Sequence, residues 1–83
     1  MPSAFVLIQT EIELARVEEV VITLRKLDGI RSAYLVSGPY DIILRVEGET
    51  PEEISSLVGD KINFVPGVYR TTTCLVIQSQ INR

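Results

Sequence analysis

The 83-residue sequence contains no histidine and only one cysteine, Cys74. The absence of histidine excludes Ser-His-Asp and Cys-His catalysis and any histidine-based metal site. One cysteine cannot form a disulfide within the chain, and its position between Thr73 and Leu75 favours a small buried apolar residue. A phosphate-binding glycine loop and a cluster of metal ligands are also missing, so we expect no enzymatic activity, no metal and no cofactor.

Basic residues are few, with 8 Lys and Arg against 11 Asp and Glu and a formal net charge of −3. Only Arg25 and Lys26 are adjacent, whereas a nucleic-acid surface needs clustered basic side chains. The N-terminal apolar run has the length of a strand and no basic segment before it, which predicts neither a signal peptide nor a membrane span. We therefore expect a cytoplasmic protein without direct nucleic-acid or membrane contacts.

Four segments have the apolar, β-branched composition of strands: residues 4–10, 30–37, 40–47 and 68–78. The spacing of the two central segments predicts a hairpin with a turn at Gly38-Pro39. A chain of this length forms one domain and buries only about 60% of its unfolded surface, so self-association would add useful burial.

Two further segments are predicted to be helices. The first has apolar residues at i, i+3, i+4, i+7 and i+10, namely Val17, Val20, Val21, Leu24 and Leu27. Gly29 is expected to end this helix in a left-handed conformation. In the second, Thr50 is the predicted N-cap, Pro51 suits the first helical position and Glu53 completes a capping box. Its apolar stripe comprises Ile54, Leu57, Val58 and Ile62.

The order β-α-β-β-α-β predicts an α+β, ferredoxin-like fold, with a four-stranded antiparallel sheet and both helices on one face. The other face would be open, yet Phe5 and Leu7 alternate with Val6 and Ile8, so the strand is apolar on both sides. This pattern predicts that the open face packs on another copy of the chain, with two-fold symmetry. An ordinary scatter of surface apolar residues is the alternative.

Asp41 is a lone carboxylate in the stretch V-S-G-P-Y-D-I-I-L, between Tyr40 and three aliphatic residues. One interpretation is a turn residue whose side chain bonds nearby backbone. The other is a ligand contact, in which the carboxylate accepts from a cationic group and neighbouring N–H groups donate to an anion. An amino acid carries both of these groups.

Other polar residues support weaker hypotheses. Thr71 and Thr73 are good strand formers, but on a face closed by a partner their hydroxyls would point the same way and bind a polar ligand. Arg45 and Arg70 are candidates to pair with carboxylates such as Asp41 or Glu47. The tyrosines, Tyr34, Tyr40 and Tyr69, are interpreted as packing residues.

Two motifs carry a family resemblance: S-G-P-Y-D, residues 37–41, and P-G-V-Y-R-T-T-T, residues 66–73. Together they resemble the regulation of amino-acid metabolism (RAM) domain, the C-terminal effector domain of Lrp/AsnC-type transcription regulators. The resemblance runs from about Ala4 to Gln78. Full-length members carry an N-terminal helix-turn-helix DNA-binding domain, so a chain of residues 1–83 would be a single RAM domain, similar to the stand-alone RAM proteins of archaea and other prokaryotes.

The resemblance implies a dimeric α/β barrel made by sheet-on-sheet packing, with dimers assembling further into rings, commonly octamers. It also implies a small effector, usually an amino acid, bound where dimers meet. By position, the effector-binding residues would be Ser37, Gly38, Pro39, Tyr40, Asp41, Thr71 and Thr73. Pro39 lacks an N–H and so removes one possible donor.

Three hypotheses follow. The first is a non-enzymatic module of transcription regulation that binds an amino acid and acts through assembly, including co-assembly with full-length Lrp/AsnC regulators. The second is a small enzyme of the dimeric α+β barrel type, which the absence of histidine disfavours. The third is a structural assembly module whose effector site is vestigial.

Overall fold

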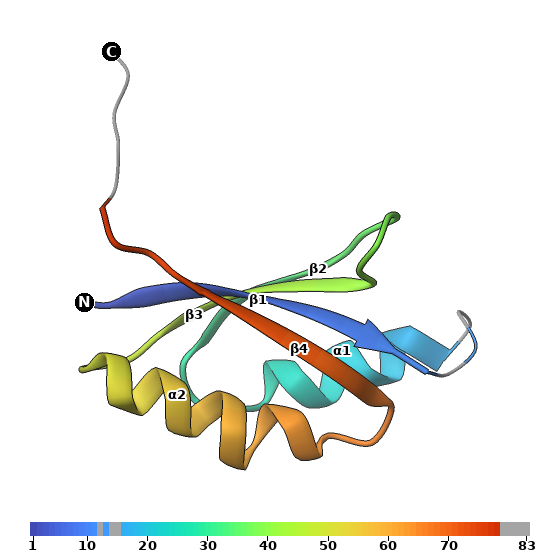
Figure 1. Ribbon diagram of the computed structural model, residues 1–83. Coiled ribbons are helices and arrows are strands. Elements are labelled where there is room, and N and C mark those ends of the chain that lie inside the picture. The colour runs from blue at the N-terminus through green and yellow to red at the C-terminus, as the bar shows by residue number, and fades with distance from the viewer. Residues whose placement is uncertain (12, 14–15, 79–83) are drawn as a thin grey trace.

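The computed structural model of the chain describes residues 1–11, 13 and 16–78. Its elements follow the predicted β-α-β-β-α-β order, with a short 3₁₀ helix before the last strand (Figure 1). The elements are β1 (Ser3–Thr10), α1 (Val17–Arg25), β2 (Ile30–Leu35), β3 (Ile42–Glu47), α2 (Pro51–Asp60), η2 (Ile62–Phe64) and β4 (Val68–Leu75).

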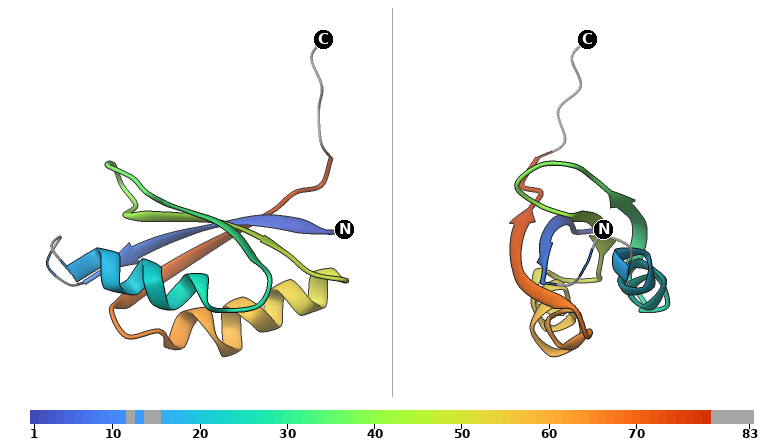
Figure 2. Two further views of the ribbon diagram at one scale, coloured as in Figure 1. Left: turned by 180° about the vertical axis from the view of Figure 1, so that it is seen from behind. Right: turned by 90° about the vertical axis from the view of Figure 1, so that its right-hand side faces the viewer.

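The four strands form one antiparallel sheet in the order β2-β3-β1-β4. Both helices lie on the same face of this sheet, as Figures 1 and 2 show from three directions. The predicted ferredoxin-like α+β architecture is therefore confirmed. Three strands are shorter than predicted, because β2 ends at Leu35, β3 begins at Ile42 and β4 ends at Leu75.

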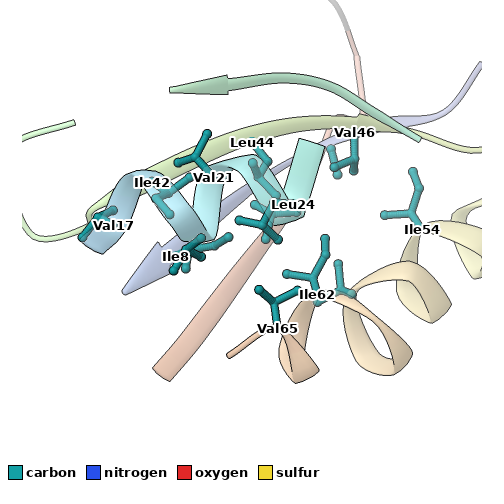
Figure 3. Packing of buried hydrophobic residues seen from close by; sticks show 14 residues of the cluster. Ile8, Val17, Val21, Leu24, Ile42, Leu44, Val46, Ile54, Ile62 and Val65 are labelled. Atoms are coloured by element: carbon teal, nitrogen blue, oxygen red, sulfur yellow. The ribbon is translucent and has the colours of Figure 1, made fainter. Parts of the chain in front are cut away.

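The core lies between the helices and the covered face of the sheet (Figure 3). Alternate residues of β1 and β3 point into it, and the pairs Val6–Leu44 and Ile8–Ile42 are opposite each other in the register. The buried residues are Ala4, Val6, Ile8, Val17, Val20, Val21, Leu24, Ile42, Leu44, Val46, Ile54, Val58, Ile62 and Val65. Burial of these side chains is the main stabilising contribution to the fold.

Helix α1 buries four of the five predicted stripe residues, and Leu27 packs against the core from just beyond the helix. The helix ends at Arg25, where i→i−3 bonds take over: the Leu27 N–H donates to the Leu24 carbonyl at 3.1 Å. Gly29 does not terminate the helix as predicted. It leads into β2 with φ of 97°, and a Cβ there would lie 2.9 Å from the Glu47 carbonyl oxygen, so glycine is required.

Helix α2 begins with the predicted cap. Thr50 Oγ1 accepts from the Glu53 N–H at 3.1 Å, and Pro51 occupies the first helical position. The Glu53 carboxylate accepts from the N–H of Glu49 at 2.8 Å, one residue earlier than in the standard capping box. Ile62, predicted on the helical stripe, is fully buried but belongs to η2, because α2 ends at Asp60.

Among residues 1–11, 13 and 16–78, no helix combines the length and the apolar composition that crossing a membrane requires.

Candidate functional site

The loop between β2 and β3 carries five of the seven predicted site residues. The Val36 N–H donates to the Asp41 carbonyl at 2.9 Å and so closes a four-residue loop, residues 37–40. Ser37, Gly38 and Pro39 are exposed, whereas Tyr40 and Asp41 are half-buried. Gly38 has φ of 153°, a backbone conformation that residues with a side chain rarely adopt. The backbone of residues 37–39 is thus accessible from solvent.

Asp41 is held by the end of β1. Its Oδ2 accepts hydrogen bonds from the Thr10 N–H at 2.8 Å and from Thr10 Oγ1 at 3.0 Å, and the Asp41 N–H donates to the Ile8 carbonyl at 2.8 Å. The carboxylate therefore does bond backbone, as the turn interpretation expected, although its partner is 31 residues away in the sequence. Among the described residues, donors bond only to Oδ2 of Asp41, and none bonds to its Oδ1.

A second contact links the same two segments. Gln9 Nε2 donates to the Pro39 carbonyl at 3.1 Å. Neither Gln9 nor Thr10 was predicted as a site residue, and no local pattern marks them. Only the antiparallel pairing of β1 with β3 brings them to the loop.

Thr71 and Thr73 do not lie on the open face of the sheet, so that prediction is wrong. Their side chains do share one side of β4, but the register pairs them with Ile8 and Val6, which point toward the helices. Thr71 Oγ1 donates to Asn63 Oδ1 at 2.7 Å, while Thr73 is exposed. Because β1 separates β4 from β3, both threonines are two strand spacings, roughly 10 Å, from β3.

The open face has an apolar centre. The register aligns Phe5 with Cys74, and places Leu7 and Tyr34 on either side of Ile43. Phe5 is 41% exposed and Tyr34 57% exposed. Cys74 is also exposed in the single chain, so the prediction of a buried cysteine is wrong for the monomer. Nothing from the described part of this chain covers these side chains.

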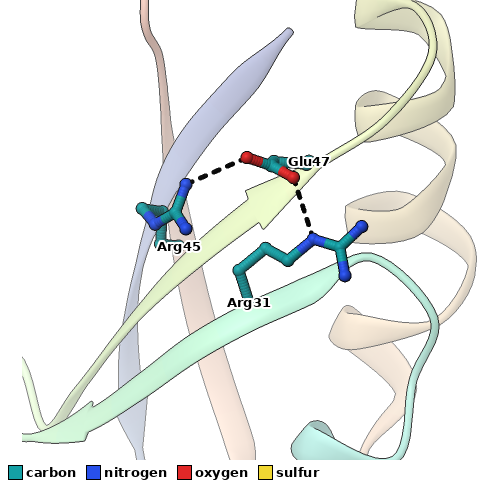
Figure 4. A network of polar contacts seen from close by, with 3 residues as sticks. All are labelled: Arg31, Arg45 and Glu47. Atoms are coloured by element: carbon teal, nitrogen blue, oxygen red, sulfur yellow. Dashed lines mark hydrogen bonds and ion pairs between the residues drawn. The ribbon is translucent and has the colours of Figure 1, made fainter. Parts of the chain in front are cut away.

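One end of the open face carries a small ionic network (Figure 4). The Glu47 carboxylate accepts from Arg31 Nε at 2.8 Å and from Arg45 Nη1 at 3.1 Å. Of the two carboxylates named as candidate partners of Arg45, Glu47 is thus the one that pairs with it. These hydrogen bonds, the one from Arg31 first, hold the pKa of Glu47 below its ordinary value. Arg70 behaves differently, since its guanidinium lies 5.4 Å from the ring centre of Tyr69.

Two surface cavities among the described residues exceed 300 Å³, and neither is lined by a predicted site residue. One of about 400 Å³ lies beside Arg25, Arg31 and Tyr34, and one of about 350 Å³ runs along α2 near Glu52 and Asp60. Within the described ranges, no three His, Cys, Asp or Glu side chains are grouped so as to hold a metal ion. The 37–41 segment therefore lines neither of these two cavities.

Comparison with known proteins adds a family match. The family model described as "Lrp/AsnC ligand binding domain" matches residues 3–83. The HTH-type transcriptional regulator FL11 of Pyrococcus abyssi is 32% identical over 76 residues, which cover 92% of this chain and 48% of that protein. The chain thus spans about half the length of the curated relatives it matches.

Solved structures have the same fold as this chain. TTHA0845 from Thermus thermophilus superposes with a TM-score of 0.87 at 32% identity, covering 99% of this chain and all of that one. The transcriptional regulator NMB0573 from Neisseria meningitidis, solved as a complex with L-Met, gives a TM-score of 0.85 at 18% identity, covering 98% of this chain and 53% of that one. At that identity the second likeness shows the shared fold.

Proposed function

The chain belongs to the Lrp/AsnC ligand binding domain family, and on that premise we propose that it is a non-enzymatic module of transcription regulation that binds an amino acid and oligomerises. The observation that carries the proposal is the segment 37–41, which begins with three exposed residues and ends with the half-buried carboxylate of Asp41. The bound L-Met of the related NMB0573 regulator supports an amino acid as the class of effector.

The chemistry of the loop suits an amino acid. The Asp41 carboxylate attracts an ammonium group and has Oδ1 available to accept from it, while Oδ2 remains with Thr10. The N–H groups of Ser37, Gly38 and Tyr40 have no acceptor within the described residues and can donate to a carboxylate; Pro39 has no N–H to offer. The ammonium and carboxylate groups of an amino acid would thus bind to adjacent parts of one loop.

The remaining two predicted contacts require a second subunit. Thr71 and Thr73 are two strands away from the loop and on the other side of the sheet in one chain, so their hydroxyls would join the site from a neighbouring copy. The exposed centre of the open face around Ile43 supports a dimer formed sheet against sheet. Such dimers would assemble into rings, of which an octamer is one closed form.

A role without direct DNA contact follows from the charge distribution. The net charge of −3 and the scattered basic residues do not suit phosphate binding. Relatives such as FL11 carry the name of HTH-type transcriptional regulators and are about twice as long. We propose that this module acts in the cytoplasm as one domain and co-assembles with full-length regulators of the family.

A thermal-shift assay with each of the twenty amino acids at millimolar concentration tests effector binding. A true effector at about 100 times its Kd stabilises the protein by roughly 2.7 kcal/mol. Asp41→Asn should abolish the shift, because the neutral amide can still accept from Thr10 but does not attract an ammonium group. Asp28→Asn, at an exposed carboxylate in the turn after α1, is the matched control and should retain it. Failure of all twenty amino acids to shift the melting temperature would sink the proposal.

The bond between Asp41 and Thr10 favours one alternative, a purely structural assembly module. In that case the carboxylate only fixes the loop, and the oligomer has the same mass with and without a pool of amino acids. Light scattering with and without that pool separates the two functions. The enzymatic alternative is disfavoured by the absence of histidine from the sequence, and relatives such as FL11 are named as transcriptional regulators.

A further inference from the structure

In the folded chain, Thr10 contacts both of the sequence motifs that carry the family resemblance, residues 37–41 and residues 66–73. On one side it bonds Asp41, the last residue of the 37–41 motif. On the other side it pairs with Val68 of the 66–73 motif, and the next residue, Glu11, donates its N–H to the Gly67 carbonyl at 3.2 Å. The end of β1 thus bonds to both motifs at this end of the sheet.

The strand changes its geometry at this residue. The register between β1 and β4 shifts between Gln9 and Thr10, which marks a β-bulge or similar irregularity. A bulge redirects side chains at the end of a strand. Here the irregularity coincides with the position at which the hydroxyl and the N–H of one residue both reach Asp41 Oδ2.

We propose that Thr10 is a positioning residue that sets the conformation of the 37–41 loop, with Gln9 as a second support. Both donors of Thr10 are used on Oδ2, so the residue acts on an effector only through Asp41. Hydrogen bonds to a carboxylate are stronger than neutral ones, and two of them fix the rotation of the group as well as its place. Oδ1 and the free N–H groups of the loop then keep one orientation.

The expected change in effector binding rests on the proposed function, whereas the expected change in the conformation of the loop does not. Three amides report the loop in the ligand-free protein: Thr10 N–H to Oδ2, Asp41 N–H to the Ile8 carbonyl, and Val36 N–H to the Asp41 carbonyl. Their exchange with solvent measures how often this end of the sheet opens.

The test uses NMR hydrogen exchange on the full chain, with Thr10→Val, which keeps the N–H and the shape but removes the hydroxyl. Exchange at Val36 and Asp41 should accelerate by about five-fold or more relative to the core amide of Leu44, the change expected for one lost hydrogen bond. Thr10→Ser should restore the original rates. Thr23→Val, which removes a threonine hydroxyl bonded to the Glu19 carbonyl on α1, should leave the ratio unchanged.

A Thr10→Val protein in which both loop amides keep their rates relative to Leu44 would overturn the inference, whatever ligand is bound. For an amino acid that shifts the melting temperature, Thr10→Val should weaken binding by about ten-fold and Thr10→Ser should recover it, whereas unchanged affinity also contradicts the inference. If no amino acid binds, the proposed function fails, and the exchange rates alone decide the role of Thr10.

Discussion

At the scale of single residues, the two carboxylates at the ends of β3 have different hydrogen-bond partners. Glu47, at the end of the strand, is held by two arginines on the open face. Asp41, just before the strand, is held by neutral donors of one threonine. The arginines compensate the charge of Glu47, whereas nothing described compensates the charge of Asp41. Of the two, Asp41 is the one suited to attract a cation.

The ionic network makes a prediction about pH. Because the pKa of Glu47 is lowered from about 4.5 in the folded protein, its pairing adds stability above that value, which is lost as pH falls through the folded pKa. An NMR titration of the Glu47 carboxyl carbon should therefore show a midpoint below 4.5. Arg31→Ala should raise this midpoint, and Arg25→Ala, which removes a nearby exposed arginine, should not. Equal midpoints in Arg31→Ala and the parent protein would refute the assignment.

Residue partners were predicted only where they are close in the sequence. Glu47 was one of two candidate partners of Arg45, and it lies two residues away on the same strand. The Asp41–Thr10 contact spans 31 residues and depends on the register of β1 with β3. Composition does not determine that register, which explains why Thr10 was missed.

At the scale of elements, local signals predicted where helices begin better than where they end. The cap of α2 was predicted from Thr50, Pro51 and Glu53, because capping involves neighbours within four residues. Its end was not, since Ile62 continues the apolar stripe from a 3₁₀ turn and periodicity cannot distinguish the two. Likewise, strand ends depend on partners across the sheet, so β4 stops at Leu75 although the apolar run continues to Ile77.

The cap of α2 can be tested by substitution. Thr50→Ala removes the acceptor for the Glu53 N–H and should lower the free energy of unfolding by about 1 kcal/mol, within a range of roughly 0.5–2. Urea denaturation monitored by circular dichroism measures the change. Ser55→Ala, at an exposed position on the same helix, is the control and should be neutral or slightly stabilising. Equal losses for the two variants would contradict a specific capping role.

At the scale of the whole molecule, the sheet has one face covered by helices and one left with an apolar centre. The alternation of Phe5 and Leu7 with Val6 and Ile8 predicted this correctly, because neighbouring strand residues point to opposite faces. The side on which Thr71 and Thr73 lie was predicted wrongly, since it depends on the pairing of β4 with β1. Both outcomes favour sites completed by a second copy of the chain.

Assembly through the open face can be tested by charge. Ile43→Lys places an ammonium group between Leu7 and Tyr34, and burying that charge against a partner sheet would be unfavourable. The variant should therefore have the mass of a monomer in size-exclusion chromatography with light scattering. Ile22→Lys, on the solvent side of α1, should keep the mass of the parent protein. An Ile43→Lys protein that keeps the parent mass would place the interface elsewhere.

Native mass spectrometry of the purified chain with a mixture of the twenty amino acids tests the central claim most directly, because one spectrum gives both subunit number and bound mass. The account predicts an even-numbered oligomer carrying an amino acid, and loss of that added mass in Asp41→Asn without loss of the oligomer. A monomer, or an oligomer that retains the same bound mass in Asp41→Asn, would contradict it.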